Sequence, residues 1–245
     1  MIIQGTKEWM PNSRNICDGC SNDCRYCYAK LKAVRYGRRT KEDWHDMRLL
    51  KIRQSTKKSN GGIMFPTTHD LHYKYRDCWF PFLKEMLENG NEVLIVSKPE
   101  LSSIRYICDN LVQFNRQMEF RFTIGTNDDT VRQFWEPNAP TIHERILALQ
   151  DAHWNGFKTS ISIEPLLMYN PRPLIEIISF YTTGDVWVGL MNYLKENDFA
   201  PEEMRWYQIQ KEINSRENIQ KVYDDLNTFG KIRWKDSIRD LLGLR

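Results

Sequence analysis

The sequence of 245 residues lacks several features that would assign it to a class of proteins at once. It has no apolar run long enough to span a membrane, no signal peptide, no internal repeat and no low-complexity tract. Only six residues are cysteine, which excludes a dense disulfide framework as the main source of stability. We therefore expect a reduced, cytoplasmic protein.

The length and the hydrophobic content of 41% suit one large domain with a substantial core. The formal net charge is only +3, but it is unevenly distributed. Residues 1–60 carry fourteen Lys and Arg against six Asp and Glu, and most of the excess lies in residues 30–58. Such a basic segment suits contacts with phosphate groups, although a solvated helix face has the same composition.

Three of the cysteines lie close together in a C-x3-C-x2-C arrangement, at Cys20, Cys24 and Cys27. Thiolates at this spacing can each bind one iron of a 4Fe-4S cluster and leave the fourth iron without a protein ligand. The alternative is a closed zinc site, with Cys17 as the fourth ligand, in a non-catalytic module that binds nucleic acid. Two further cysteines fall on predicted helices, so we expect no second cluster.

This spacing, with the aromatic Tyr26 directly before the third cysteine, resembles the cluster motif of the radical S-adenosylmethionine (SAM) superfamily. The resemblance implies an enzyme, of the lyase or the transferase type, with a 4Fe-4S cluster whose open iron chelates SAM. It also implies an external one-electron reductant of the flavodoxin or ferredoxin type. Reductive cleavage of SAM then gives methionine and a 5′-deoxyadenosyl radical that abstracts a hydrogen atom from the substrate.

Strand and helix patterns alternate along the chain. The predicted strands are residues 14–17, 63–65, 92–97, 118–124, 157–163 and 185–191, and the predicted helices are residues 28–55, 75–88, 100–115, 141–154 and 173–181. This order predicts an α/β fold with a parallel sheet, either open and doubly wound or closed toward a barrel.

The resemblance selects a partial (β/α)6 TIM-type barrel, with the cysteine loop at the rim where the strands end. We expect a single radical SAM domain over residues 1–245, with the core barrel at about 14–192. A C-terminal extension at about 200–245 is predicted to cover the open side. It contains a helix at 201–215, a strand at 231–234 and a helix at 236–242.

Polar side chains follow the predicted strands at the catalytic rim. Thr68, His69 and Asp70 follow the second strand, where the resemblance places contacts to the amino group of SAM. Asp70 has an alternative role as the N-cap of the next helix. Lys98 follows the third strand and suits the carboxylate of SAM. The fourth strand supplies groups for the ribose and the methionine end of SAM, unless two of them are ordinary turn residues; they are Thr123, Thr126 and Asn127.

The fifth and sixth predicted strands end in two further candidates. Glu164 closes an apolar strand, where a carboxylate is costly unless it is paired or used, so we predict a catalytic or cofactor-binding role. A salt bridge with Arg121 or Arg172 is the alternative. After the sixth strand, the backbone near Gly189 can approach adenine, and Asn192 can face SAM or the substrate.

Several strings resemble the spore photoproduct lyase branch of the superfamily over about residues 14–170. They are Phe120–Thr123, Phe134–Pro140, Glu144–Arg145, Asn155–Gly156 and the two tyrosines of Tyr26–Tyr28. The string Ser162–Leu167 is similar to uncharacterised phage-associated radical SAM proteins.

Tyr26 and Tyr28 are available to relay a hydrogen atom; the alternative for Tyr26 is simple packing over the cluster. We expect Glu136 and Arg145 to form a structural ion pair. Thr67 stands where the branch has a hydrogen-donating cysteine, so repair of thymine dimers by that mechanism is not expected. The basic segment and the resemblance favour a nucleic acid or nucleotide substrate. A peptide or a small metabolite is the alternative.

Overall fold

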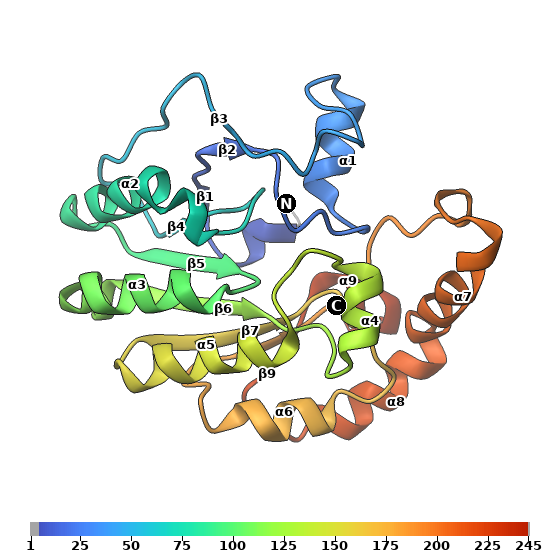
Figure 1. The fold of residues 1–245 in the computed structure, drawn as a ribbon. Helices are drawn as coiled ribbons and strands as arrows, with labels where there is room; N and C mark the ends of the chain where they lie inside the picture. Colours follow the sequence, from blue (N-terminus) through green and yellow to red (C-terminus); the bar gives the residue numbers. More distant parts are fainter. Residues whose placement is uncertain (1–4, 245) are drawn as a thin grey trace.

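Seven parallel strands form the main sheet of the computed structural model, which describes residues 5–244. The sheet is curled into a half-barrel (Figure 1), which confirms the predicted partial TIM-type barrel. Its strands are, in spatial order, β1 (Asn12–Ser13), β4 (Ile63–Met64), β5 (Val93–Ser97), β6 (Met118–Thr123), β7 (Lys158–Ile163), β8 (Val186–Val188) and β9 (Ile232–Trp234).

The helices that connect successive strands lie along the outer side of the sheet (Figure 1). They are α2 (Arg76–Glu88), α3 (Leu101–Leu111), α5 (Ile142–Trp154) and α6 (Arg172–Ser179). A side-chain cap fixes the start of α5, because the hydroxyl of Thr141 accepts a hydrogen bond from the backbone N–H of Glu144. No helix within residues 5–244 is long and apolar enough to cross a membrane.

Alternation along β6 and β7 separates the core from the concave face of the sheet. Phe120 and Phe122 on β6, and Ile161 on β7, belong to the buried core beneath the helices. The intervening residues Arg121 and Ser160 therefore face the hollow of the half-barrel, where their side chains hydrogen bond at 2.9 Å. This two-residue period brings the polar residues at the strand ends onto one concave surface.

The segment before the second core strand differs from the prediction. The helix expected at 28–55 ends early, as α1 (Tyr28–Arg35), and Gly37 follows with a φ of 64°. The chain then returns as β3 (Arg48–Leu49), antiparallel to β2 (Cys17–Asp18). The strand expected at 14–17 is wrong except at Cys17, because residues 14–16 connect β1 to β2.

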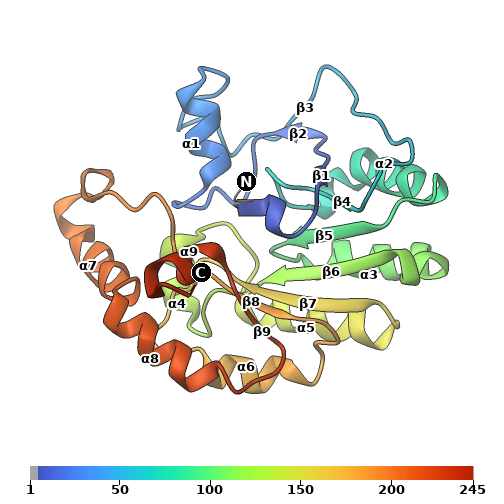
Figure 2. The ribbon, with the colours of Figure 1, turned by 180° about the vertical axis from the view of Figure 1, so that it is seen from behind.

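The C-terminal extension also differs from the prediction. The helix expected at 201–215 is η5 (Pro201–Glu203) followed by α7 (Met204–Ile213), and a second helix, α8 (Arg216–Leu226), was not predicted. Helix α8 packs beside α6 on the outer side (Figure 2), where Arg172 and Asp225 form an ion pair at 2.6 Å. Strand β9 pairs in parallel with β8, so the sheet has a seventh strand before α9 (Asp236–Leu242).

The short remaining elements connect this framework. One helix among them, α4 (Asp129–Trp135), was not predicted and lies beyond the ends of the strands (Figure 1). The others are short 3-10 helices, at η1 (Gly5–Glu8), η2 (Tyr73–Tyr75), η3 (Val112–Gln117) and η4 (Glu196–Asp198).

Candidate active site

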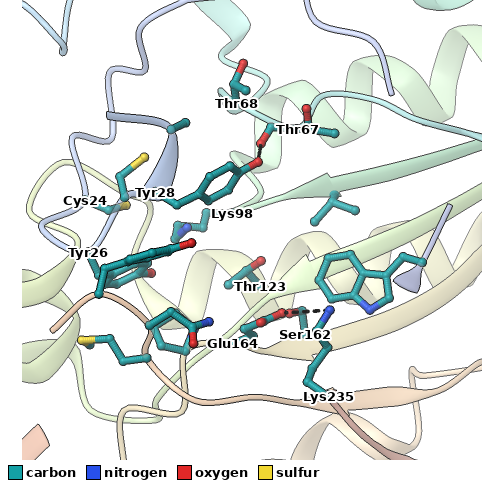
Figure 3. Close-up of a pocket in the computed structure, with 18 of the residues that line it drawn as sticks. Cys24, Tyr26, Tyr28, Thr67, Thr68, Lys98, Thr123, Ser162, Glu164 and Lys235 are labelled. Carbon is teal, nitrogen blue, oxygen red and sulfur yellow. Dashed lines mark hydrogen bonds and ion pairs between the residues drawn. The ribbon is translucent and has the colours of Figure 1, made fainter. Parts of the chain in front are cut away.

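A cavity of about 640 Å³ lies where the strands of the sheet end (Figure 3). Its wall contains the three cysteines of the C-x3-C-x2-C loop and most of the predicted strand-end residues. The predicted residues that line it are Cys20, Cys24, Tyr26, Cys27, Tyr28, Thr68, His69, Asp70, Lys98, Thr123, Glu164 and Asn192. Thr126 and Asn127 are absent from the described lining.

Local backbone geometry folds the cysteine loop tightly. Gly19 has a φ of 109°, and a Cβ atom at this position would lie 2.3 Å from the carbonyl oxygen of Asp46, so only glycine fits. The backbone N–H of Cys20 donates to the carbonyl of Trp44 at 2.9 Å. At the other end of the loop, Cys27 is the N-cap of α1, and its Sγ accepts a hydrogen bond from the backbone N–H of Lys30 at 3.4 Å.

The chemistry of the three thiols fits an iron–sulfur cluster. Burial raises the pKa of Cys20 and Cys27, and it raises the pKa of Cys24 to about 12. These groups therefore remain neutral thiols until bound positive charge, such as that of iron, stabilises the thiolates. The N-terminus of α1, at Cys27, also stabilises the negative charge of a thiolate.

The arrangement of the three thiols is compatible with a cluster. Within residues 5–244, no three His, Cys, Asp or Glu side chains converge closely enough to hold one metal ion. In a 4Fe-4S cluster each thiolate binds its own iron, so the thiols surround the cluster without meeting at one point. Cys17, the fourth ligand of the zinc alternative, is buried in β2 and lies outside the described cavity lining.

Asp70 is surrounded by donors from the chain itself. Its Oδ1 accepts hydrogen bonds from the Ser97 hydroxyl and the Lys98 backbone N–H, both at 2.7 Å. Its Oδ2 accepts one from the Asn22 amide at 2.7 Å and lies 3.7 Å from the Sγ of Cys20. Burial alone would raise the pKa of Asp70, but Lys98 and these hydrogen bonds hold it below its usual value. The carboxylate therefore ties the cysteine loop to the end of β5 and does not cap the following helix.

His69 is a neutral part of the cavity wall. Its Nε2 accepts a hydrogen bond from the backbone N–H of Ile16 at 3.2 Å, so the ring proton is on Nδ1 and is donated to the carbonyl of Asp70 at 3.0 Å. Burial lowers the pKa of His69 to about 4. Because both ring nitrogens bond within the protein, the imidazole holds the end of β4 against the segment that leads into the cysteine loop.

The threonines after β4 are fixed by one asparagine. The side chain of Asn15 accepts hydrogen bonds from the backbone N–H groups of Thr67 and Thr68, and donates to the Thr67 hydroxyl at 2.8 Å. The Tyr28 hydroxyl donates to the Thr67 carbonyl. Within the described chain, the hydroxyl of Thr68 has no hydrogen-bond partner, so it can bond to a molecule in the cavity.

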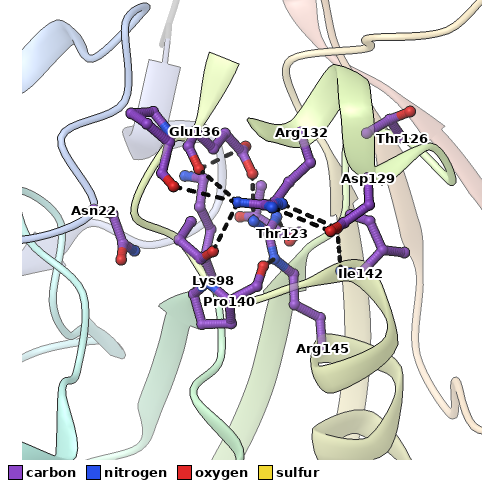
Figure 4. Close-up of polar contacts among 12 residues, drawn as sticks. Asn22, Lys98, Thr123, Thr126, Asp129, Arg132, Glu136, Pro140, Ile142 and Arg145 are labelled. Atoms are coloured by element: carbon purple, nitrogen blue, oxygen red, sulfur yellow. Dashed lines mark hydrogen bonds and ion pairs between the residues drawn. The ribbon is translucent and has the colours of Figure 1, made fainter. Parts of the chain in front are cut away.

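A buried charge network surrounds Glu136 (Figure 4). Glu136 accepts hydrogen bonds from the Tyr26 hydroxyl at Oε1 and from the guanidinium of Arg145 at Oε2, and the Nζ of Lys98 lies 4.0 Å from Oε1. This contact confirms the predicted Glu136–Arg145 ion pair. Burial alone would lower the pKa of Lys98, but Cys24, Glu136 and other acids raise it overall, so the ammonium stays charged beside the cavity.

Hydroxyl groups at the ends of β6 and β7 form the floor of the cavity (Figure 3). Thr123 and Ser162 are paired in register and both line the cavity. The Oγ of Ser162, which the sequence did not single out, is buried without a hydrogen-bond partner in the described chain. Thr126 instead accepts a hydrogen bond from the backbone N–H of Asp128, which is the role of a turn residue, and Asn127 is exposed.

Glu164 pairs with a lysine from the C-terminal extension. The Nζ of Lys235 lies 3.7 Å from Glu164 and 3.1 Å from Glu8, and it sits 4.3 Å above the ring of Trp9. Burial raises the pKa of Glu164, and Lys235 lowers it only in part. Gly189 leaves room for this pair, because a Cβ atom there would lie 2.9 Å from Lys235 and 3.0 Å from Glu164.

The two salt bridges considered for Glu164 from the sequence are not formed. Arg121 pairs with Glu119 at 2.8 Å, and Arg172 pairs with Asp225 on α8. The pairing with Lys235 had no signal in the sequence, because it depends on β9 joining the sheet beside β8. Asn192 lines the cavity and is exposed.

Comparison with known proteins supports the fold. No protein-family model and no curated protein matches the chain. The structure is similar to that of a double mutant of spore photoproduct lyase with bound AdoMet, that is SAM, and dinucleoside spore photoproduct. The TM-score is 0.52 and the sequence identity 14%, over 89% of this chain and 74% of the other. The chain therefore shares the partial-barrel fold of that enzyme.

Proposed function

We propose that the protein is a radical SAM enzyme in which Cys20, Cys24 and Cys27 hold a 4Fe-4S cluster. The observation that carries the proposal is that these thiols and the polar strand-end residues line one cavity of a radical SAM-type half-barrel. When bound, the cluster supplies the electron that cleaves SAM and so generates the radical that abstracts hydrogen from the substrate. The protein binds and orients the reactants and excludes water.

Residues around the cavity are suited to the polar groups of SAM. The charged ammonium of Lys98 would pair with the carboxylate, and the free hydroxyl of Thr68 would accept a hydrogen bond from the amino group. Thr123, Ser162 and Glu164 lie farther along the floor and would bind hydroxyl groups of the ribose. Asn192 would bond to SAM or the substrate at the open side.

Tyr26 and Tyr28 are the proposed hydrogen-atom relay. Both phenols are partly buried beside the cluster loop, and this burial raises the pKa of each, so both retain the hydrogen that a relay requires. The Tyr28 hydroxyl contacts the carbonyl of Thr67, at the position where the branch resemblance has a hydrogen-donating cysteine. The Tyr28 side chain would thus lie next to the position that the hydrogen-donating cysteine occupies in that branch.

A nucleic acid or nucleotide is the proposed substrate class. In the basic segment, Lys32, Lys51 and Lys57 form no ion pair with any residue that the structure describes, and Lys32 also lines the cavity. Other cations there are already engaged: Arg39 is buried and holds loop carbonyls, and Arg53 pairs with Glu85. The similar structure holds a dinucleoside photoproduct, which is a fact about that enzyme. A peptide or small metabolite remains the rival class.

Anaerobic purification and reconstitution with iron and sulfide test the proposal. The wild type should be brown, bind about four irons per chain and cleave SAM when an artificial reductant, flavodoxin or ferredoxin supplies electrons. Replacing Cys24 with Ala should abolish iron binding, whereas Cys17→Ala should preserve it. A colourless wild type that holds one zinc ion, and loses it with either substitution, would establish the zinc module instead.

A further inference from the structure

Of the two residues between the second and third cysteines of the loop, Arg25 contacts the C-terminal extension directly, and Tyr26 packs on an apolar cluster that the extension also contacts. Arg25 and Tyr26 follow Cys24 and precede Cys27. Tyr26 packs against an apolar cluster whose members come from α4, from the ends of β7 and β8 and from the extension. The cluster comprises Val131, Phe134, Trp135, Leu167, Met191, Leu194, Phe199 and Trp206.

Arg25 makes three separate contacts outside the loop. Its backbone N–H donates to the carbonyl of Trp135 at 2.9 Å. Its guanidinium lies 4.2 Å above the ring of Phe134 and pairs with the carboxylate of Glu203 at 2.9 Å. The other oxygen of Glu203 accepts a hydrogen bond from the backbone N–H of Ala200 at 3.2 Å, so the first turn of η5 already orients this carboxylate.

The ring of Phe134, over which Arg25 lies, also stacks on aromatic residues of the extension. Phe134 stacks on Trp206 of α7, with ring centroids 4.6 Å apart and planes inclined by 13°. Phe199 stacks on Phe134 as well, at 6.4 Å and 19°. The contacts of the Phe134 ring with the Arg25 guanidinium and with the Trp206 ring therefore connect the cysteine loop to α7.

We infer that residues 199–206, here called the extension clamp, position the cysteine loop for the cluster, with Arg25 as the positioning residue. This inference rests on the proposed function. Cys24 and Cys27 must reach different irons of one cluster, so their separation depends on the backbone that joins them. Within the loop, that backbone has the Cys27 N–H to Cys24 carbonyl bond at 3.2 Å, and the clamp contacts supplement it.

The test compares cluster retention among single variants after anaerobic reconstitution. Trp206→Ala and Arg25→Gln should lose iron to a chelator about tenfold faster than the wild type, because stacking and cation–π contacts of this size correspond to about tenfold in an equilibrium. Trp206→Phe keeps a stacked ring, so its rate of iron loss should lie between those of the wild type and Trp206→Ala. The matched control is Trp154→Ala, since Trp154 is an exposed tryptophan at the end of α5.

A charge exchange separates positioning from general destabilisation. Arg25→Glu and Glu203→Arg should each accelerate iron loss, and the double variant should recover part of the retention while the thermal stability of the cluster-free proteins stays similar. If the wild type takes up no iron, the proposed function fails. If the wild type binds the cluster and Trp206→Ala and Arg25→Gln retain it as well as Trp154→Ala does, the clamp inference is overturned.

Discussion

Buried ionisable side chains around the cavity serve two different purposes. His69 and Asp70 use all their polar atoms to hold the chain together. Lys98 and Glu164 keep polar atoms on the cavity wall and are the ones that can meet a ligand. The sequence could place all four at the rim, because each follows a predicted strand. The sequence could not show which of the four side chains bond only within the protein, because hydrogen-bond partners such as Ile16 and Asn22 come from elsewhere in the chain.

The buried His69 gives a first prediction, on the pH dependence of stability. Its pKa is about 4 in the folded protein and 6.5 in the unfolded chain, so the unfolded state binds more protons between these values. Stability should therefore be complete above pH 6.5 and fall with decreasing pH, by about 3 kcal/mol at pH 4 from this group. Urea unfolding of the wild type and His69→Gln between pH 5 and 7 checks this. Equal slopes for both proteins would contradict it.

Glu136 gives a second prediction, because it is buried beside Arg145. Glu136→Gln leaves the guanidinium without its charged partner and should cost about 3–5 kcal/mol of unfolding free energy at pH 7. Burial alone would raise the pKa of Glu136, but Arg145 and Lys98 lower it overall. Its contribution is therefore present above pH 4.5 and is lost as the pH falls further, so the two proteins should converge in acid.

The control for Glu136 is an exposed ion pair. Glu217 and Lys221 lie one turn apart on α8, with their charged atoms 2.8 Å apart in solvent. Glu217→Gln should leave the denaturation midpoint nearly unchanged. Similar losses for both variants would show that the buried network is not specially stabilising.

At the scale of elements, the sequence predicts best where local pattern and tertiary pairing agree. The strands expected at 118–124 and 157–163 are found at 118–123 and 158–163, because their alternating apolar residues match a sheet covered on one face. The helix expected at 28–55 is wrong beyond Arg35. Its helix-forming composition is overridden by the positive φ at Gly37 and by the return of the chain to pair with β2.

The cysteine loop gives a prediction about two glycines with positive φ. In Gly19→Ala the new Cβ meets the carbonyl of Asp46, whereas at Gly37 a new Cβ would have no other atom within 4 Å. Both variants carry backbone strain of about 1 kcal/mol or more, and only Gly19→Ala must also displace the loop. Gly19→Ala should therefore lose iron binding and Gly37→Ala should keep it. Iron assays and urea unfolding, performed side by side, distinguish them; equal iron contents would refute this account of the loop.

At the scale of the molecule, the two ends of the described chain meet at the incomplete side of the barrel. The strands β1 and β9 are the edges of the sheet, and Glu8, just before β1, contacts Lys235, just after β9. Lys235 and the start of α9, both in the C-terminal extension, line the cavity at this side. These contacts join distant parts of the sequence, which is why local patterns did not reveal Lys235.

The distribution of charge over the molecule gives the last prediction, on the substrate class. If the basic segment binds the phosphates of a nucleic acid, binding should weaken steeply as salt is added, because counterions are released. Replacing Lys32, Lys51 and Lys57 together with Gln should make the slope of log K against log salt less steep by about 2–3 for duplex DNA.

A matched control variant also replaces three lysines with Gln, so its net charge changes by the same amount, but these lysines lie outside the basic segment. They are Lys84, Lys211 and Lys221 on α2, α7 and α8. The control variant should leave that slope unchanged, as measured by fluorescence anisotropy of labelled DNA and RNA. A wild type that binds neither at low salt, or equal effects of both triple variants, would remove the basic segment as support for a nucleic-acid substrate. The cavity would then be expected to accept a peptide or a small metabolite, because the half-barrel and its thiols do not depend on that segment's charge.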